Sequence, residues 1–200
     1  SYKAKYLTRE VTFQPNENTM YGRRWHEGVE AALKHGTPLS DEFAHMQPTV
    51  DVMKQWPRLW VERDSAVDAN FEPVDWRQRW VGAKIDIQSY EKERGYARII
   101  DWKTGKPRDD YLQLDINAIT VFAAAKWVNH IRAGYAYTKS GTISKRDYHR
   151  EQLPELQASL KQKVLRIAAA HDSGVFPEQP NGLCRNFCDV TSCHFNGRNK

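Results

Sequence analysis

Ile99-Ile100-Asp101-Trp102-Lys103-Thr104-Gly105-Lys106 is the stretch of sequence that decides the fold and the chemistry of this chain. An apolar run ends here in an acidic residue and a lysine, two positions apart. Side chains at positions i and i+2 of a β-strand leave the same face, so Asp101 and Lys103 are predicted to point into one small volume. A carboxylate can hold a divalent metal, and an ammonium beside it can hold a phosphate or activate a water. The pair therefore indicates phosphodiester chemistry.

The hydrophobic periodicity on both sides of this stretch predicts an α/β fold. The order of elements is helix, strands, helix, strands, helix, which is typical of a central mixed β-sheet flanked by helices. The cysteine-containing C-terminal tail follows the last helix. Helices are expected over residues 17–35, 41–56, 109–127 and 154–171, and strands over 59–69, 79–90, 96–103, 130–139 and 142–149.

The chain length suits one domain with a small appendage. The core domain is expected to span residues 1–173, and residues 174–200 are expected to form a cysteine-rich tail packed on it. Within the core we distinguish a helical part, a catalytic sheet, a helix with a hairpin, and a long helix; their ranges are 17–56, 59–103, 109–149 and 154–171.

Composition narrows the class of protein. Of the 200 residues, 40% are hydrophobic and 28% charged, as in a soluble globular protein. No apolar run of about 18 residues occurs, so no membrane-spanning helix is expected. The net charge of +5 suits a protein that approaches phosphate backbones. The three cysteines all follow residue 183, unlike those of a secreted, disulfide-rich domain, so an intracellular location is expected.

Two earlier residues are candidates to join Asp101 at a metal. Asp86 is expected on the face of its strand opposite Ile85, and if this strand pairs with the next as a hairpin, the two carboxylates converge. Such a pair with one or two further ligands would hold Mg²⁺ or Mn²⁺. His26 follows Gly22 by one helical turn, and the glycine indicates a close approach there. The plainer alternatives are a solvated Asp86 and a surface His26 paired with Glu30.

Glu62 and Gln113 are further candidates. Glu62, on the first expected strand, is placed either to hydrogen-bond a metal-bound water or to lie exposed. Gln113 follows Lys103 by ten residues, on the next expected helix. It is placed to position DNA or a ligand, or simply to cap the sheet.

The ordered set resembles the PD-(D/E)XK nuclease superfamily in its RecB-like branch, and more narrowly its bacteriophage-encoded exonuclease-type proteins. The resemblance runs from Tyr21 to His194 and is most specific between Ile100 and Lys106. It implies a restriction-endonuclease-like core and a metal-dependent DNA nuclease, foremost an exonuclease of phage replication or recombination. Its substrate would be linear DNA ends, single- or double-stranded, in the host cytoplasm, with a phage recombination protein as a further partner. Two alternatives stay open: a non-catalytic nucleic-acid-binding protein on the same fold, and an iron–sulfur nuclease of the CRISPR-adaptation type.

The resemblance also assigns roles to residues. Lys103 becomes the catalytic lysine, and Gln113 matches the glutamine that opens the following helical motif. Lys103 would orient or deprotonate the attacking water or stabilise charge in the transition state; we favour the last role, because an amine acts as a base only when its pKa is strongly lowered. Two positions depart from the family pattern: Ile85 replaces the proline before Asp86, and Asn117 stands where a tyrosine is common. The implied catalytic group is Lys103, Asp101, Asp86, Glu62 and Gln113, and the implied ligands of Mg²⁺ or Mn²⁺ are His26, Asp86, Asp101 and the backbone carbonyl of Trp102.

The tail holds a second candidate metal site, formed by Cys184, Cys188, Cys193 and His194. Four such ligands within eleven residues could hold a structural Zn²⁺. In RecB-like nucleases, three C-terminal cysteines and a fourth near the N-terminus often hold an iron–sulfur cluster. This sequence has no fourth cysteine. A ligand upstream of residue 1, completion by His194, and no metal at all remain open.

Basic residues that flank the proposed site are candidates for contacts with DNA phosphates. Lys106 is the best of them, because it directly follows the catalytic strand. The alternative for each is a solvated surface charge. The full set is Lys106, Arg23, Arg24 and Arg108.

Overall fold

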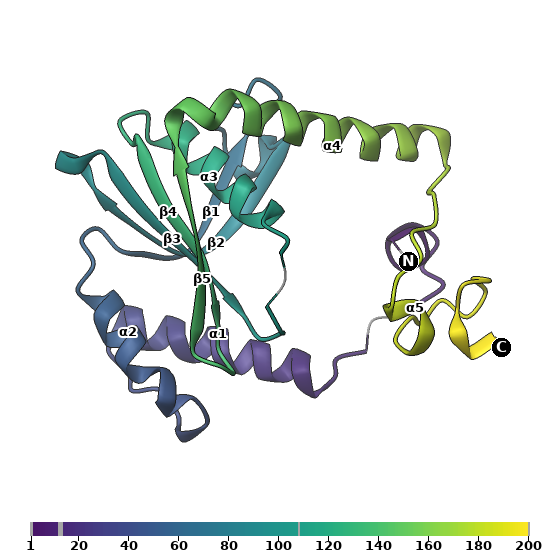
Figure 1. Ribbon diagram of the computed structural model, residues 1–200, viewed down its shortest axis with the longest axis horizontal. Helices are drawn as coiled ribbons and strands as arrows, with labels where there is room; N and C mark the ends of the chain where they lie inside the picture. The colour runs from purple at the N-terminus through teal and green to yellow at the C-terminus, as the bar shows by residue number, and fades with distance from the viewer. Residues whose placement is uncertain (1, 12–13, 108, 200) are drawn as a thin grey trace. The chain divides into compact units, whose positions relative to one another are not determined.

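The computed structural model describes residues 2–11, 14–107 and 109–199, and its larger part is built on a five-stranded sheet (Figure 1). The strand order is β1-β2-β3-β4-β5. The first three strands form an antiparallel meander, β3 and β4 are parallel, and β4 and β5 form an antiparallel hairpin. The predicted mixed sheet is confirmed. The strands are β1 (Trp60–Val67), β2 (Val81–Glu91), β3 (Tyr96–Lys103), β4 (His130–Tyr137) and β5 (Thr142–His149).

Four helices lie where the sequence pattern predicts them, with one refinement, and the short helix in the tail was not predicted. The helix expected over residues 41–56 is a 3₁₀ segment (Asp41–Met46) that leads into α2 (Gln47–Lys54). Pro48 lies in the first turn of α2, where its missing N–H has no partner in any case, so it begins the helix and does not break it. The other helices are α1 (Glu17–His35), α3 (Leu112–Ala124), α4 (Leu153–Ser173) and the short α5 (Leu183–Asn186).

Helices cover both faces of the sheet (Figure 1). On one face α1 and α2 bury an apolar layer that includes Trp25, Phe43 and Trp102. On the other face α3, which connects the parallel strands β3 and β4, packs with Ile99 and Ile131, and the start of α4 joins this layer. Each fully buried apolar side chain contributes about 1.5–3 kcal/mol, so the two layers fix the helices on the sheet.

The expected alternation of side chains along β2 fails at Asp86. The sequence predicts Ile85 and Ile87 on one face, with Asp86 on the other. Instead, Ile85 packs with α3 and Ile87 packs with α1. The ladder between β2 and β3 starts only at Ile87, which pairs with Ile100. The two strands separate beyond that rung, and this interruption lies where the polar site residues gather.

The chain forms two compact units, which we describe separately. The first comprises residues 17–161 and contains the whole sheet. The second comprises residues 1–16 and 162–200. Within this second unit, the Tyr2 hydroxyl lies 3.3 Å from His171 Nε2 and Lys5 pairs with Asp189 at 3.8 Å. The packing of the tail on the core stays a prediction. Among the described residues, no helix has the length and apolar character needed to cross a membrane.

Candidate active site

The site begins where β2 and β3 separate. Asp86 Oδ2 accepts a 2.8 Å hydrogen bond from the main-chain N–H of Trp102. The carboxylate thus replaces the backbone rung that the ladder lacks at this point. Asp86 and Asp101 are both buried, with 8% and 1% of their surface exposed. Two acidic groups held in a dry environment are costly unless a positive charge neutralises them.

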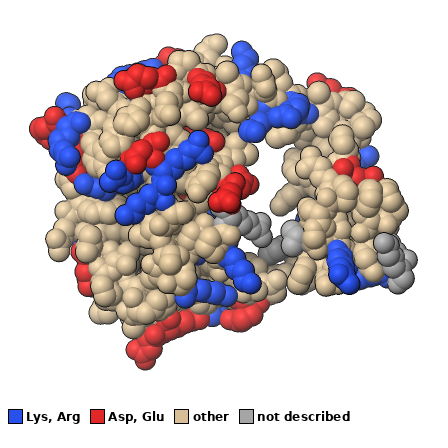
Figure 2. All heavy atoms as spheres, viewed as in Figure 1, with Lys and Arg blue, Asp and Glu red and all other residues tan. Residues whose placement is uncertain are grey.

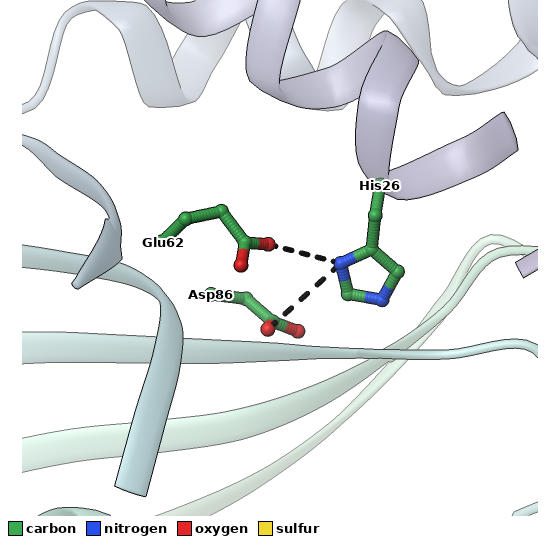
Figure 3. Close-up of side chains that lie close together, drawn as sticks. All are labelled: His26, Glu62 and Asp86. Atoms are coloured by element: carbon green, nitrogen blue, oxygen red, sulfur yellow. Dashed lines mark hydrogen bonds and ion pairs between the residues drawn. The ribbon is translucent and has the colours of Figure 1, made fainter. Parts of the chain in front are cut away.

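His26 reaches these carboxylates from α1. The preceding residue, Trp25, is fully buried and packs edge-to-face on Trp102, with ring centroids 4.9 Å apart. That contact places α1 over the end of β3. His26 Nδ1 then lies 3.0 Å from Glu62 Oε1 and 3.9 Å from Asp86 Oδ1, and both carboxylates point toward this nitrogen (Figure 3).

Glu62 enters the site through an unusual backbone conformation. Its φ is +55°, in the left-handed region that costs a residue with a side chain about 1–2 kcal/mol. The β1–β2 ladder pairs Val61 and Arg63 but skips Glu62. The second carboxylate oxygen pairs with Lys84 at 2.9 Å. Backbone strain of this kind concentrates at functional sites, and here it accompanies the carboxylate that faces His26.

Three side chains can hold a metal. Ligand atoms of His26, Glu62 and Asp86 all lie within 4.8 Å of one another, the one such group among the described residues. One imidazole and two carboxylates are all groups that bind divalent metal ions in proteins. Burial of the neighbouring acids supports the fit, because a cation would neutralise them. The structure thus groups Glu62 with two of the predicted ligands. The Trp102 N–H bonds Asp86, and the role of the Trp102 carbonyl stays a prediction.

The environment shifts the pKa values of these groups in a consistent way. Burial, followed by the charge of Asp101, raises the pKa of Asp86 to about 7. Burial also raises the pKa of Asp101, against the opposing effect of Lys103. The hydrogen bond to Glu62 raises the pKa of His26, and the same bond lowers the pKa of Glu62. Without a metal, the site therefore retains protons near neutral pH.

Lys103 lies beside this group, held by two partners. Its Nζ is 2.6 Å from Asp101 Oδ2 and 2.5 Å from Gln113 Oε1. The Gln113 amide donates in turn to Asp101 Oδ1. Gln113 therefore bridges the ends of the Asp101-x-Lys103 pair from the first turn of α3. Asp101 and Lys103 thus point into one small volume, and Gln113 joins them from α3. The Lys103 ammonium lies 4.8 Å from the centre of the Tyr135 ring.

A cavity of about 710 Å³ opens next to Lys103, on the α3 face of the sheet. Strands β2, β3 and β4 and the first turns of α3 contribute its walls. Lys103 and Gln113 belong both to the predicted catalytic group and to the lining of this cavity. Other lining residues include Lys84, Lys106, Asn117, Tyr135 and Tyr137.

The basic candidates differ in their surroundings. Lys106 is exposed and lines the cavity. Arg23 pairs with Glu27 at 2.8 Å, and Arg24 is held by two glutamates, Glu17 and Glu42. Arg108 lies outside the described residues. On the face shown in Figure 2, basic side chains are interspersed with acidic ones, so any attraction for phosphate there is local.

The tail residues do not gather around one point. Cys184, Cys188 and Cys193 are half-buried, and His194 Nδ1 lies 3.6 Å from Glu178 Oε1. Together with His194 they form no close ligand group among the described residues. A structural metal in the tail stays a prediction.

Two site residues were not predicted from the sequence. Lys84 pairs with Glu62, and its position two residues before Asp86 on the same strand is a signal that could have identified it. Tyr135 lies beside Lys103 because β4 runs parallel to β3, with Tyr135 opposite Asp101 in the register. No local sequence pattern marks that position.

A mixed sheet whose strand end combines Asp86, Asp101 and Lys103 defines a restriction-endonuclease-like fold with the layout of a phosphodiesterase site. The chain matches the family model of the PD-(D/E)XK nuclease superfamily over residues 1–194 and belongs to that superfamily. No curated protein matches it. Members of the superfamily are nucleases that hydrolyse phosphodiester bonds with divalent metals, so nucleic acid is the class of substrate.

Proposed function

We propose that this protein is a metal-dependent DNA exonuclease that acts on linear ends, in phage replication or recombination in the host cytoplasm. The observation on which the proposal depends is the arrangement of Lys103, Asp101 and Gln113 beside the His26, Glu62 and Asp86 group. The resemblance to phage exonuclease-type proteins supports the choice of DNA ends. Superfamily membership supports hydrolysis of the phosphodiester bond.

The site residues have two roles, metal binding and stabilisation of charge on the phosphate. His26, Glu62 and Asp86 would hold a divalent cation, which when bound polarises the scissile phosphate and lowers the pKa of water. Lys103, fixed by Asp101 and Gln113, presents an ammonium to the charge that develops on the phosphate. An ammonium paired with a carboxylate suits this electrostatic role. Because its partners are already in place, little reorganisation is needed as the reaction proceeds.

Cleavage assays with point variants test the proposal. Linear and circular DNA would be incubated with Mg²⁺ or Mn²⁺ and either wild type, Asp101→Asn or Lys103→Ala. We expect wild type to degrade linear DNA from its ends, and each variant to lose at least about 100-fold in rate, as for loss of a group that stabilises charge in a transition state. Asp64→Asn and Lys145→Ala change exposed residues outside the site and should retain full activity.

Two outcomes would overturn it. Equal activity in wild type and the site variants would mean that the group is not catalytic. Salt-dependent DNA binding by wild type, without cleavage in either metal, would favour the non-catalytic binding protein instead. Cleavage of circular DNA at the same rate would leave a nuclease but remove the preference for ends.

We also propose a structural metal in the tail, bound by Cys184, Cys188, Cys193 and His194. Elemental analysis of protein purified anaerobically separates the alternatives. Zinc at one equivalent would support a zinc site. Iron with visible absorbance would support a cluster and, with it, the alternative of a CRISPR-adaptation-type nuclease. Absence of both metals would overturn this proposal without affecting the catalytic one.

A further inference from the structure

Asn117 on α3 is a buried amide without a hydrogen-bonding partner. Its side chain is fully buried, and neither Nδ2 nor Oδ1 has a partner among the described residues. An unsatisfied buried amide costs about 1–3 kcal/mol per polar group, so such groups normally have a reason to be present. Asn117 also lines the cavity beside Lys103. A ligand at this wall would supply the missing partners.

The cavity has the chemistry of a site for a flat, polar, aromatic group. Tyr135 and Tyr137 contribute aromatic walls, and Ile116 adds apolar surface. Lys106 lines the same cavity with an exposed side chain, as does Lys84, whose ammonium is paired with Glu62. The volume of about 710 Å³ lies within the range of about 300–1,000 Å³ usual for small-molecule sites. The interior thus combines rings with one donor–acceptor amide, and cations are available nearby.

We propose that this cavity receives one unpaired nucleobase of the substrate strand, next to the phosphate that Lys103 contacts. The Asn117 amide would hydrogen-bond the edge of the base, and the tyrosines that line the cavity would pack against the base. This inference rests on the proposed nuclease function and makes it more specific: the strand that enters the site is single-stranded, or locally unpaired, at the position of cleavage.

A base fits these groups better than a phosphate does. A phosphate only accepts hydrogen bonds, whereas Asn117 offers both a donor and an acceptor, as the edge of a base does. Lys106 is better placed for a phosphate beside the base. A paired base cannot enter, because its edge and faces are covered in the duplex; enzymes that read a base in a pocket take it out of the stack.

An abasic scan provides the first test. A set of single-stranded oligonucleotides would each have one base replaced by a tetrahydrofuran abasic site, moved stepwise past the cleaved bond. We expect one position at which loss of the base slows cleavage by wild type about tenfold or more, in line with the contribution of one stacked base. A uniform response at all positions would overturn the base pocket while leaving the nuclease intact.

The Asn117→Leu variant provides the second test. Leucine has a similar size and removes the unsatisfied amide, so we expect the melting temperature to be unchanged or higher. Cleavage of the intact oligonucleotide should fall toward the rate of the abasic one, and the difference between them should largely disappear. Ser144→Ala is the control, because it removes a hydroxyl that is also buried and unpartnered but lies outside the cavity. It should leave the difference in rate between the intact and abasic oligonucleotides unchanged. Full retention of the difference in Asn117→Leu would overturn the inference.

Direct binding separates failure of this inference from failure of the proposed function. Fluorescent forms of the same oligonucleotides would be titrated with wild type and Asn117→Leu in EDTA, where cleavage is not expected. Wild type could cleave no DNA under any condition and still bind one abasic oligonucleotide about tenfold more weakly than the intact one. That result would support the base pocket and contradict the nuclease function. Equal binding of all oligonucleotides by both proteins would contradict the pocket.

Discussion

Asp86 accepts a hydrogen bond from the backbone N–H of Trp102, at 2.8 Å, in place of the next rung of the β2–β3 ladder. The carboxylate therefore has two functions that normally belong to different groups. It closes the sheet at the point where the strands separate, and its other oxygen faces His26. Only the second function needs a negative charge.

Because the two functions of the Asp86 carboxylate differ in their need for charge, two substitutions of Asp86 should have different effects. Asp86→Asn keeps an oxygen for the Trp102 N–H and removes a charge that burial disfavours, so unfolding by urea at pH 8 without metal should require at least as much free energy as in wild type. Asp86→Ala should cost about 1–3 kcal/mol, because the Trp102 N–H loses its partner. Both variants should be inactive. Equal destabilisation of the two would contradict the structural function of the hydrogen bond.

The pKa shifts predict that metal-free protein loses stability as pH rises from 5 to 8. The folded pKa of Asp86 is raised to about 7, so its protonated form favours folding, and that advantage declines as pH rises toward 7. The pKa of His26 is also raised, so its contribution is complete below its ordinary pKa and is lost as pH rises through the folded value. Both effects have the same sign. Urea unfolding in EDTA at several pH values measures the decline.

Mn²⁺ binding should have the opposite dependence on pH. The metal needs an ionised Asp86 and a neutral His26, so binding releases protons that the free site retains. We expect the association constant to rise by up to about tenfold per pH unit for each released proton between pH 6 and 8, as measured by calorimetry. Asp86→Asn should bind Mn²⁺ weakly at every pH. An affinity that stays constant over this range would contradict His26 and Asp86 as ligands.

The backbone at Glu62 leads to a prediction about strain. Glu62→Gly and Glu62→Ala both remove the carboxylate, so they should lower cleavage equally. They differ in how well they tolerate the observed φ of +55°. Glycine adopts this conformation without steric cost, so Glu62→Gly should be more stable than Glu62→Ala by about 1 kcal/mol. The same pair at Asp64, which has no such conformation, should show alanine at least as stable as glycine. If the alanine variant is more stable than the glycine variant at both positions, the backbone at Glu62 is not strained.

Much of the fold could be predicted because its signals are local. The helix over residues 17–35 and the strands over 96–103 and 142–149 were predicted with the observed bounds, since periodicity and turn residues define them. The pairing of the strands that carry Asp86 and Asp101 followed from hairpin connectivity alone. His26 was a candidate from its spacing to Gly22, and the family resemblance was needed to favour a ligand over a surface histidine.

The remaining features depend on tertiary packing. A positive φ at Glu62 has no sequence signal, since glutamate gives no indication of a left-handed conformation. The change of face between Ile85 and Ile87 arises from strand separation, whereas alternation is the default expectation. Gln113 could be named from its spacing, but its bridge between Asp101 and Lys103 requires the position of α3 on the sheet.

Gly22 can be tested for two separate roles, one in the packing of the fold and one in substrate binding. The sequence indicated a close approach at this glycine, one turn before His26. A Cβ there would lie 3.6 Å from Thr104 Cγ2, an ordinary contact, so the fold itself does not require glycine. Gly22→Ala should therefore raise the free energy of unfolding by about 0.5–1 kcal/mol, because glycine weakens a helix interior. Gly28→Ala, in the same helix and with similar space, is the matched control. We expect both variants to keep full cleavage, which would mean that Gly22 has no part in substrate binding. If both variants are stabilised but only Gly22→Ala loses cleavage, the substrate approaches the α1 backbone at Gly22.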